Sequence, residues 1–301
     1  MKVFIIGATG YVGSHVVKEL IAHDHEVIGF CRNQAGSKKL ETHGARAFIG
    51  DINNREALMS VAIEADATVF SPQIPNQEHE QEIVMDLLTT YAHTDKAFIF
   101  TSGTGVLAQR TNGQWSEDTF AEDDIVIPSK IVRTRYITEQ LTRNSGYYDC
   151  RAMVIRPPNI WGEGVNGMAK LIADSVEKTG YACYVGSGLN LYTDVHVKDL
   201  AILYRLALER GTGGSLYHAA AGETSNRFLA EVIAGRMGVK TRSITIDAAF
   251  DVWGKFYTLV GMSASSRSRS PISRRELGWK PRYVDMPKSL LEDDYDFFGN
   301  H

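Results

Sequence analysis

A loop with three glycines follows directly on an apolar run at the start of the chain. The run covers residues 3–6, and Gly7, Gly10 and Gly13 come next, just before apolar residues begin to recur at helical spacing. Between a strand and a helix, such glycines allow a sharp turn, a close approach of the backbone to a phosphate and tight packing of the helix on the strand. Free N–H groups at the helix start favour an anion. The loop therefore predicts a pyrophosphate-binding turn between a strand and a helix.

Short apolar runs alternate with helix-like stretches through the first half of the chain. These runs are rich in Val, Ile and Phe and do not alternate strictly with polar residues, which is typical of parallel strands buried on both faces. The repeated strand-helix-strand pattern predicts an α/β fold with a doubly wound parallel sheet, or Rossmann fold, covered by helices on both sides. The predicted strands cover residues 3–6, 27–30, 47–49, 68–70, 97–100 and 152–155.

After Arg156 the pattern changes to helical stretches separated by short irregular pieces. The longer predicted helices cover residues 167–178, 197–210 and 225–237. Near the end, Ser270 and Pro271 are typical of a helix start, and Gly278 of a helix end. We therefore expect a dinucleotide-binding domain over residues 1–156. Residues 157–301 are expected to form a smaller, mainly substrate-binding lobe, from which some elements return to the main sheet.

Composition and charge exclude several classes of protein. With 32 basic and 36 acidic residues, the chain has no global field that favours nucleic acid. The longest apolar runs have strand length only, and the first residues enter such a run without a leader pattern. Three widely spaced cysteines, Cys31, Cys150 and Cys183, fit reduced thiols better than a disulfide frame or a zinc site. We expect a cytoplasmic protein whose partner is a small molecule, with no metal, nucleic acid or membrane.

The residue after the second predicted strand favours one form of the dinucleotide. Many NAD-binding folds have a carboxylate there for the ribose hydroxyls, whereas this chain has Cys31, Arg32 and Asn33. An arginine can pair bidentately with a 2′-phosphate and stack on the adenine. Arg32 therefore predicts NADP rather than NAD, and the alternative is an arginine that only faces solvent.

Motifs along nearly the whole chain resemble the short-chain dehydrogenase/reductase superfamily, in its extended or atypical branch of epimerase/dehydratase-like proteins. The similar segments are the glycine loop and residues 50–52, 98–103, 156–162, 194–199 and 276–281. Together with the glycine loop and Arg32, this resemblance implies a cofactor site made of Gly7, Thr9, Gly10, Tyr11, Val12, Gly13, Arg32, Asp51, Ile52, Ser71, Pro72, Thr101, Arg135, Pro157, Asn159 and Ile160. In the alternative reading, Asp51 only caps a helix and the prolines only shape a loop.

The resemblance also implies a Ser, a Tyr and a Lys, with the last two four residues apart on one helix so that the lysine lowers the pKa of the tyrosine. That helix is expected over residues 129–142, and its register puts Ile131 at the tyrosine position and Arg135 at the lysine position. Isoleucine cannot exchange a proton, and arginine stays protonated. We therefore expect Ser102 and Arg135 in the site. The remaining catalytic candidates are Thr104, Tyr136 and His196, although a histidine before a helix is more often structural.

Each of two polar segments has two interpretations. Residues 109–128 form a connection longer than most, with an acidic cluster, and are either a lid or a plain surface loop. Residues 263–270 are rich in Ser and Arg and favour a polar loop, with contact of Arg267 or Arg269 to an anion as the lesser alternative.

These expectations favour an NADP-dependent oxidoreductase that transfers hydride to a small carbonyl, imine or similar acceptor. One alternative is a dinucleotide-binding regulator or sensor that lost catalysis, because the Tyr and Lys are missing. The other is a sugar-nucleotide epimerase or dehydratase, suggested by the extended-branch motifs. A homodimer formed through two helices is expected only by analogy with the fold.

Overall fold

A seven-stranded parallel sheet forms the centre of the computed structural model, which describes residues 1–148 and 150–297. Its strand order is β10-β6-β5-β4-β1-β2-β3, and every neighbouring pair is parallel. The strands are β1 (Lys2–Ile6), β2 (Glu26–Cys31), β3 (Arg46–Ile49), β4 (Ala67–Phe70), β5 (Ala97–Thr101), β6 (Arg151–Arg156) and β10 (Leu216–His218). The predicted Rossmann fold is confirmed, and β10 is a strand that returns from the second half of the chain.

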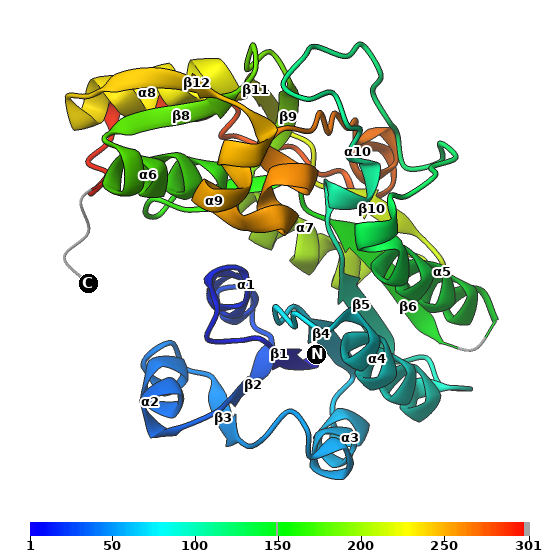
Figure 1. The fold of residues 1–301 in the computed structure, drawn as a ribbon. Helices are drawn as coiled ribbons and strands as arrows, with labels where there is room; N and C mark the ends of the chain where they lie inside the picture. Colours follow the sequence, from blue (N-terminus) through cyan, green and yellow to red (C-terminus); the bar gives the residue numbers. More distant parts are fainter. Residues whose placement is uncertain (149, 298–301) are drawn as a thin grey trace.

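Helices cover both faces of this sheet (Figure 1). The apolar residues of β1 point alternately to the two faces of the sheet: Val3 and Ile5 pack in one core cluster, and Phe4 and Ile6 in another. Both faces therefore have to be buried under helices. The first cluster contains residues of α1 (Tyr11–Ile21), α2 (Gln34–Thr42) and α7 (Val197–Arg210). The second contains residues of α3 (Arg55–Glu64) and α4 (Gln77–Tyr91), and α5 (Arg133–Tyr148) packs beside α4.

The second half of the chain builds two small sheets around its own core cluster. One sheet contains β7 (Asn159–Trp161), β9 (Leu191–His196) and β11 (Gly222–Ser225), and the other β8 (Tyr181–Val185) and β12 (Lys240–Ile244). The helices are α6 (Gly167–Thr179), α8 (Asn226–Met237), α9 (Ile246–Tyr257), α10 (Pro271–Leu277) and α11 (Met286–Glu292), with a π-helical turn, η3 (Thr258–Met262), after α9. Within residues 1–148 and 150–297, none of the helices is long and apolar enough to cross a membrane.

The expected helix over residues 129–142 is wrong in its bounds. A short 3₁₀ turn, η2 (Lys130–Val132), comes first, and α5 begins at Arg133. The side-chain amide of Gln77 on α4 explains the start, because its Nε2 donates to the Ile131 carbonyl at 2.9 Å and its Oε1 accepts from the Arg135 N–H at 3.1 Å. A residue far away in sequence thus caps the first turn of α5.

A buried ion pair fastens α5 to the sheet. Arg156, the last residue of β6, donates from Nε to both carboxylate oxygens of Glu139 at 3.0 and 3.1 Å, and from Nη2 at 2.5 Å. Both side chains are at most 3% exposed. His218 at the end of β10 lies 3.3 Å from Arg156 Nη1. Burial and the positive charge of Arg156 lower the pKa of His218 to about 3, so its ring is neutral at neutral pH.

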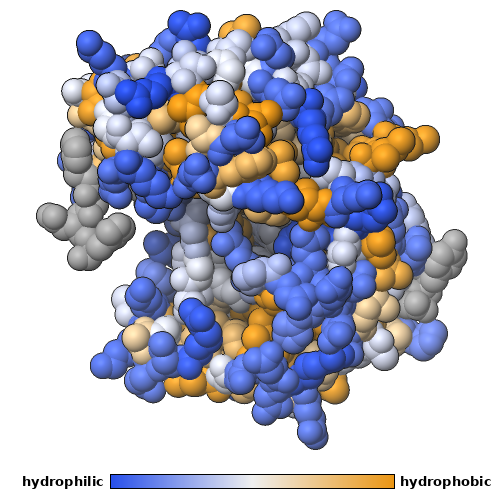
Figure 2. All heavy atoms as spheres, in the orientation of Figure 1, coloured by the Kyte–Doolittle hydropathy of each residue, from blue (hydrophilic) through white to orange (hydrophobic). Residues whose placement is uncertain are grey.

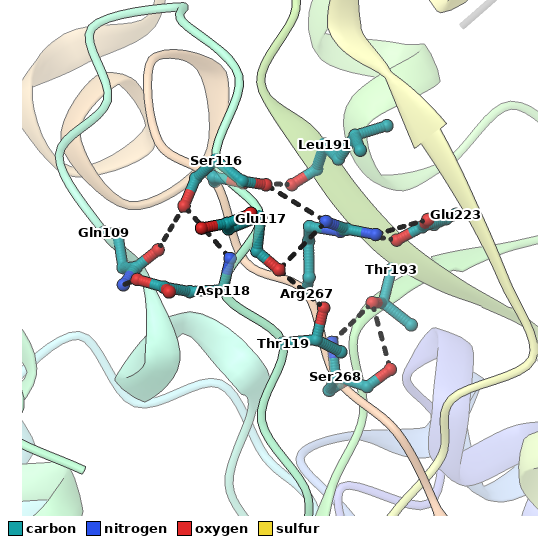
Figure 3. A network of polar contacts seen from close by, with 11 residues as sticks. Gln109, Ser116, Glu117, Asp118, Thr119, Leu191, Thr193, Glu223, Arg267 and Ser268 are labelled. Carbon is teal, nitrogen blue, oxygen red and sulfur yellow. Dashed lines mark hydrogen bonds and ion pairs between the residues drawn. The ribbon is translucent and has the colours of Figure 1, made fainter.

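Residues 109–128 are tied to the C-terminal half by the polar contacts that Figure 3 shows. Arg267 donates from Nε and Nη2 to the carboxylate of Glu223 at 2.9 and 3.0 Å, and from Nη1 to the Ser116 carbonyl at 3.0 Å. Its guanidinium therefore already contacts an anion of the protein itself. A lid made of this loop would have to break these contacts in order to move.

Glu122, which belongs to the acidic cluster of the loop, is only 2% exposed. Its carboxylate accepts from the backbone N–H groups of Ile272 and Ser273 at 3.2 and 3.0 Å, in the first turn of α10. Ser270 is the N-cap residue of α10, as expected, but its hydroxyl donates to the Ala220 carbonyl instead. The acid from the distant loop caps this helix.

Candidate functional site

The glycine loop has the geometry of a pyrophosphate cradle. Gly7 adopts φ +95°, a region that disfavours other residues. A Cβ on Gly13 would lie 2.1 Å from the Gly7 carbonyl oxygen, so only glycine lets α1 pack this closely on β1. Gly10 is the N-cap of α1 and offers no side-chain acceptor to the first N–H groups of the helix. These groups point to an anionic ligand, and the residues fit the pyrophosphate of a dinucleotide.

The surrounding cofactor candidates lie beside this cradle or along the same edge of the sheet. The backbone of Ser71 and Pro72, just after β4, is in tight contact with Gly7, with 2.8 Å from the Pro72 nitrogen to a Cβ built on that glycine. Thr9 borders the start of α2 near Gly36. Arg32 directly follows β2, is exposed, and has no ion-pair partner among the residues that the structure describes.

Tyr11 and Val12 turn toward the protein. The Tyr11 hydroxyl donates to the Gly162 carbonyl at 2.5 Å, which links α1 to the loop after β7, and burial raises the pKa of this tyrosine. Val12 packs against the core cluster under α1. Only the backbone N–H groups of these two residues therefore remain available to a ligand at the cradle.

Asp51 and Ile52 follow β3. The Asp51 carboxylate accepts from the backbone and side-chain nitrogens of Asn53 at 3.0 and 2.8 Å, and the cap of α3 is Asn54. Asp51 therefore closes a local turn and does not cap the helix. Ile52 is partly buried against the core.

The segment after β6 connects the sheet to the C-terminal half. The Pro157 carbonyl accepts from the Thr104 N–H at 2.9 Å. Asn159 is 7% exposed, and its Oδ1 accepts from the Met168 N–H at 2.9 Å, which positions the start of α6. Ile160 packs against the core cluster of the sheet. The side chains of Asn159 and Ile160 are thus occupied by structure, and Pro157 lies directly beside the end of β5.

Two hydroxyl candidates follow β5. Ser102 donates its N–H to the Ile155 carbonyl at 2.9 Å, while its buried Oγ has no hydrogen-bond partner among the described residues. Thr104 is 1% exposed and lies beside the hydroxyl of Tyr192. Thr104 Oγ1 is likewise buried without a hydrogen-bond partner among the described residues, and Ser102, the less buried of the two residues, is the better hydrogen-bond donor for a bound molecule.

Arg135 reaches the same strand end from α5, but it is already paired. Its Nη2 donates to Glu80 Oε1 at 2.8 Å and its Nη1 to the Thr101 carbonyl at 3.3 Å. Glu80 is fully buried, and its second oxygen has no partner among the described residues. Burial raises the pKa of Glu80 although Arg135 opposes the rise. Two groups of the protein, the Glu80 carboxylate and the Thr101 carbonyl, thus already hold the guanidinium of Arg135 at the end of β5.

Sequence reasoning missed Glu80, although the chain contains a signal for it. Residues 80, 84, 87 and 91 share one face of α4, and the other three are apolar and buried. A carboxylate on such a face needs a partner from a neighbouring element. The partner is Arg135, and the pair can be identified only once α4 and α5 lie side by side.

Ile131 and Tyr136 lie against a small apolar cluster of Val106, Leu107, Val126, Val132 and Val260. Ile131, which the resemblance leads us to expect at the tyrosine position, presents no exchangeable proton. Tyr136 packs its ring on this cluster beside the 3₁₀ helix η1 (Thr104–Leu107). The cluster brings the start of α5, the segment after β5 and η3 together.

His196 belongs to another part of the molecule. It is the N-cap of α7, its Nδ1 accepts from the Lys198 N–H at 3.2 Å, and its ring stacks on Tyr283 with 4.2 Å between centroids. It lines a cavity of about 430 Å³ that neither Ser102 nor Arg135 lines. Burial lowers the pKa of His196 to about 4, so the ring is neutral at neutral pH.

By residue type, six polar and aromatic residues could either surround one substrate or form helix surface and lobe core: Arg133, Arg135, Tyr136, Trp161, Tyr192 and His196. The structure does not bring all six together. Trp161 and Tyr192 are buried in the core of the C-terminal half, 2% and 9% exposed. Trp161 donates to Asp194 at 3.0 Å. Arg133, Arg135 and Tyr136 lie at the start of α5, and His196 lines a cavity that none of these three residues lines.

Comparison with known proteins agrees with this geometry. Residues 3–220 match the NAD dependent epimerase/dehydratase family. An uncharacterized protein of Saccharomyces cerevisiae is 32% identical over 97% of each chain. The decarboxylating sterol-4-alpha-carboxylate 3-dehydrogenase of Dictyostelium discoideum is 24% identical over 74% of this chain and 72% of its own. The structure of dTDP-glucose 4,6-dehydratase from Bacillus anthracis with NAD has a TM-score of 0.76 at 19% identity, covering 97% of this chain and 94% of that one. This chain belongs to the NAD-dependent epimerase/dehydratase family of the extended short-chain dehydrogenase/reductase superfamily.

Proposed function

We propose that the protein is an NADP(H)-dependent oxidoreductase that transfers hydride to a small carbonyl, imine or similar acceptor. The observation that carries the proposal is the glycine cradle with Arg32, and no carboxylate, directly after β2. An exposed, unpaired guanidinium at this place suits a 2′-phosphate. A cavity of about 310 Å³ beside Thr9 adds Lys18, Lys39 and His43 and has no acidic residue in its lining, which favours an anionic cofactor.

When bound, the cofactor supplies the hydride. The residues of the chain then have to bind the acceptor and handle the proton without the family tyrosine. In this proposal the free Oγ of Ser102 donates a hydrogen bond to the acceptor oxygen or nitrogen, and water supplies the proton. The guanidinium of Arg135 has further N–H donors besides those that bind Glu80 and the Thr101 carbonyl, and in this proposal they hold the ribose hydroxyls. Residues 1–156 carry the cofactor in this proposal, and residues 157–301 mainly the substrate.

The test is a parallel titration of the purified protein with NADPH and NADH, followed by nicotinamide fluorescence. We expect a clear preference for NADPH in the wild type and its selective loss in Arg32→Asp. An exposed control is Arg242→Asp on β12, which should bind both cofactors as the wild type does. Equal weakening of NADPH and NADH by Arg32→Asp would overturn the assignment of the 2′-phosphate to Arg32.

Two other functions have specific support. Ile131 in place of the tyrosine favours a regulator or sensor that binds the dinucleotide without turnover. The structural likeness to a sugar-nucleotide dehydratase favours epimerase or dehydratase chemistry. Substrate-dependent consumption of NADPH supports the oxidoreductase. Tight binding of the dinucleotide without turnover over a broad panel of substrates supports the regulator. Turnover of substrate without net change of the cofactor supports the epimerase or dehydratase.

A further inference from the structure

Helix α9 is interrupted at Gly254, which adopts φ 75° and ψ 165°. A Cβ at this glycine would meet nothing within 4 Å, so its backbone conformation and not lack of space calls for glycine. Gly254, Lys255, Phe256 and Tyr257 are exposed in succession, and we call these four residues the wall segment. The rings of Phe256 and Tyr257 are 45% and 49% exposed and meet edge to face with 5.5 Å between centroids.

The wall segment is anchored on both sides. Before it, Trp253 is 6% exposed and donates from Nε1 to the Leu171 carbonyl at 2.7 Å. After it, the Thr258 hydroxyl donates to the Ala249 carbonyl at 2.9 Å. The two exposed rings are therefore carried by a fixed backbone, which lowers the entropy that ligand binding would otherwise cost.

The π-helical turn η3, which follows the wall segment, contacts the segment after β5. Val260 in η3 packs so closely on Gly105 that a Cβ built there would lie 2.7 Å from Val260 Cγ1. Gly105 is three residues beyond Ser102, whose Oγ lacks a partner among the described residues. In Figure 1 the end of α9 lies on the side of the C-terminal half that faces α1. Figure 2 shows the surface hollowed between these two halves, with apolar surface above the hollow.

Building on the proposed function, we propose that the wall segment binds the substrate and that this substrate is a flat, uncharged aromatic carbonyl compound. Exposed aromatic rings held edge to face offer a large apolar contact area and favour ring stacking. The acceptor oxygen then points toward the segment after β5, which Val260 contacts at Gly105, three residues beyond Ser102. A sugar nucleotide would need cations for its diphosphate, and Lys255 is the single cation of the wall segment.

The experiment is equilibrium dialysis of 2-acetonaphthone and, separately, of UDP-glucose against the NADP⁺-saturated protein. The variants are Tyr257→Ala and the double variant Phe256→Ala/Tyr257→Ala. Phe228→Ala is the matched control, because this phenylalanine is 50% exposed on α8. We expect 2-acetonaphthone to bind the wild type and the control equally, and the double variant about tenfold more weakly.

Tyr257→Phe should keep the affinity for 2-acetonaphthone, because the ring and not the hydroxyl makes the contact. Three results would overturn the proposal. The first is that the wild type does not bind 2-acetonaphthone at all, the second that both alanine variants bind it as the wild type does, and the third that Phe228→Ala weakens its binding as much as they do. Binding of UDP-glucose that falls in Lys255→Ala would assign the segment to a sugar nucleotide instead. The same preparations are also titrated with NADPH and assayed for NADPH consumption over a panel of acceptors. No NADPH binding or no turnover in the wild type would overturn the proposed function, whereas unchanged binding of 2-acetonaphthone in the wall-segment variants would overturn only this inference.

Discussion

The resemblance assigns a functional motif both to the glycine loop and to the start of α5, yet the two segments differ in kind. The loop reproduces the family pattern, and its geometry depends on backbone, as the contact between Gly13 and Gly7 shows. At the start of α5, where the resemblance leads us to expect a Tyr and a Lys, the chain has Ile131 and Arg135, and the arginine is held by Glu80 from another helix. A motif made of backbone thus depends on which residues the backbone geometry admits, whereas a motif made of side chains can change its chemistry on the same scaffold.

The largest effect is expected for a substitution in the glycine loop. Gly13→Val places side-chain carbons where the Gly7 carbonyl lies, so α1 must shift and the cradle opens. NADPH binding in a fluorescence titration should become undetectable. The control Gly235→Ala on α8, where a Cβ meets nothing within 4 Å, should bind normally and melt at the same or a slightly higher temperature. Normal NADPH binding by Gly13→Val would show that the loop does not hold the cofactor.

The next effect tests what holds α5 in place. Glu139→Ala leaves Arg156 buried without its carboxylate, which should lower the free energy of unfolding by about 3–5 kcal/mol. Urea unfolding followed by circular dichroism measures it. The exposed ion pair of Arg227 with Glu231 is the comparison, and Glu231→Ala should cost under about 1 kcal/mol. Equal losses in the two variants would contradict the role given to Glu139.

Asp194 differs from the buried carboxylates on α4 and α5, because it has no cationic partner among residues 1–148 and 150–297. Asp194 is 1% exposed, and burial raises its pKa to about 7, although Trp161 and Thr224 donate to it. Because this value lies above the unfolded one of 3.8, the contribution of Asp194 to stability is fully present below pH 3.8 and is lost as the pH rises through about 7.

From pH 4 to pH 8, the free energy of unfolding of the wild type should therefore fall relative to that of Asp194→Asn. The expected change is on the order of 3 kcal/mol, measured by urea unfolding at each pH. Asparagine keeps an acceptor for the Trp161 N–H and does not titrate. Parallel pH curves for the two proteins would show that Asp194 does not titrate in this range.

A smaller effect is expected when the arginine of α5 is removed. Arg135→Ala leaves Glu80 buried with one contact fewer, so the free energy of unfolding should fall by about 2 kcal/mol and NADPH should bind more weakly. Adding Glu80→Ala should restore part of the stability but not the affinity for NADPH. If the double variant regained the affinity, Arg135 would act only through Glu80 and not on the ribose.

The smallest effect separates the two neighbours on α5. Tyr136→Phe keeps the ring that packs on the apolar cluster and removes a hydroxyl, so stability should change by under about 0.5 kcal/mol and NADPH binding should stay intact. Steady-state turnover of the acceptor gives the decisive measurement. Loss of turnover with normal binding would make Tyr136 the proton donor and would overturn the role proposed for water.

Local patterns predicted most of the fold. All six expected strands are present, α7 has the expected bounds, and the cradle has the backbone geometry that its glycines require. These features depend on residues that are close in sequence, such as the apolar runs that must be buried on both faces of a sheet. The start of α5 was misplaced because Gln77, from α4, decides it.

By itself, the sequence determined the doubly wound sheet, the glycine cradle and the position of Arg32 after β2, because periodicity and glycine spacing act within a few residues. The tertiary structure alone decided the pairing of Arg135 with Glu80, the separation of His196 from Ser102 and the burial of Glu122 at α10. Those outcomes rest on side chains far apart in the chain, and buried charges and orphaned N–H groups find their partners only when whole elements pack together.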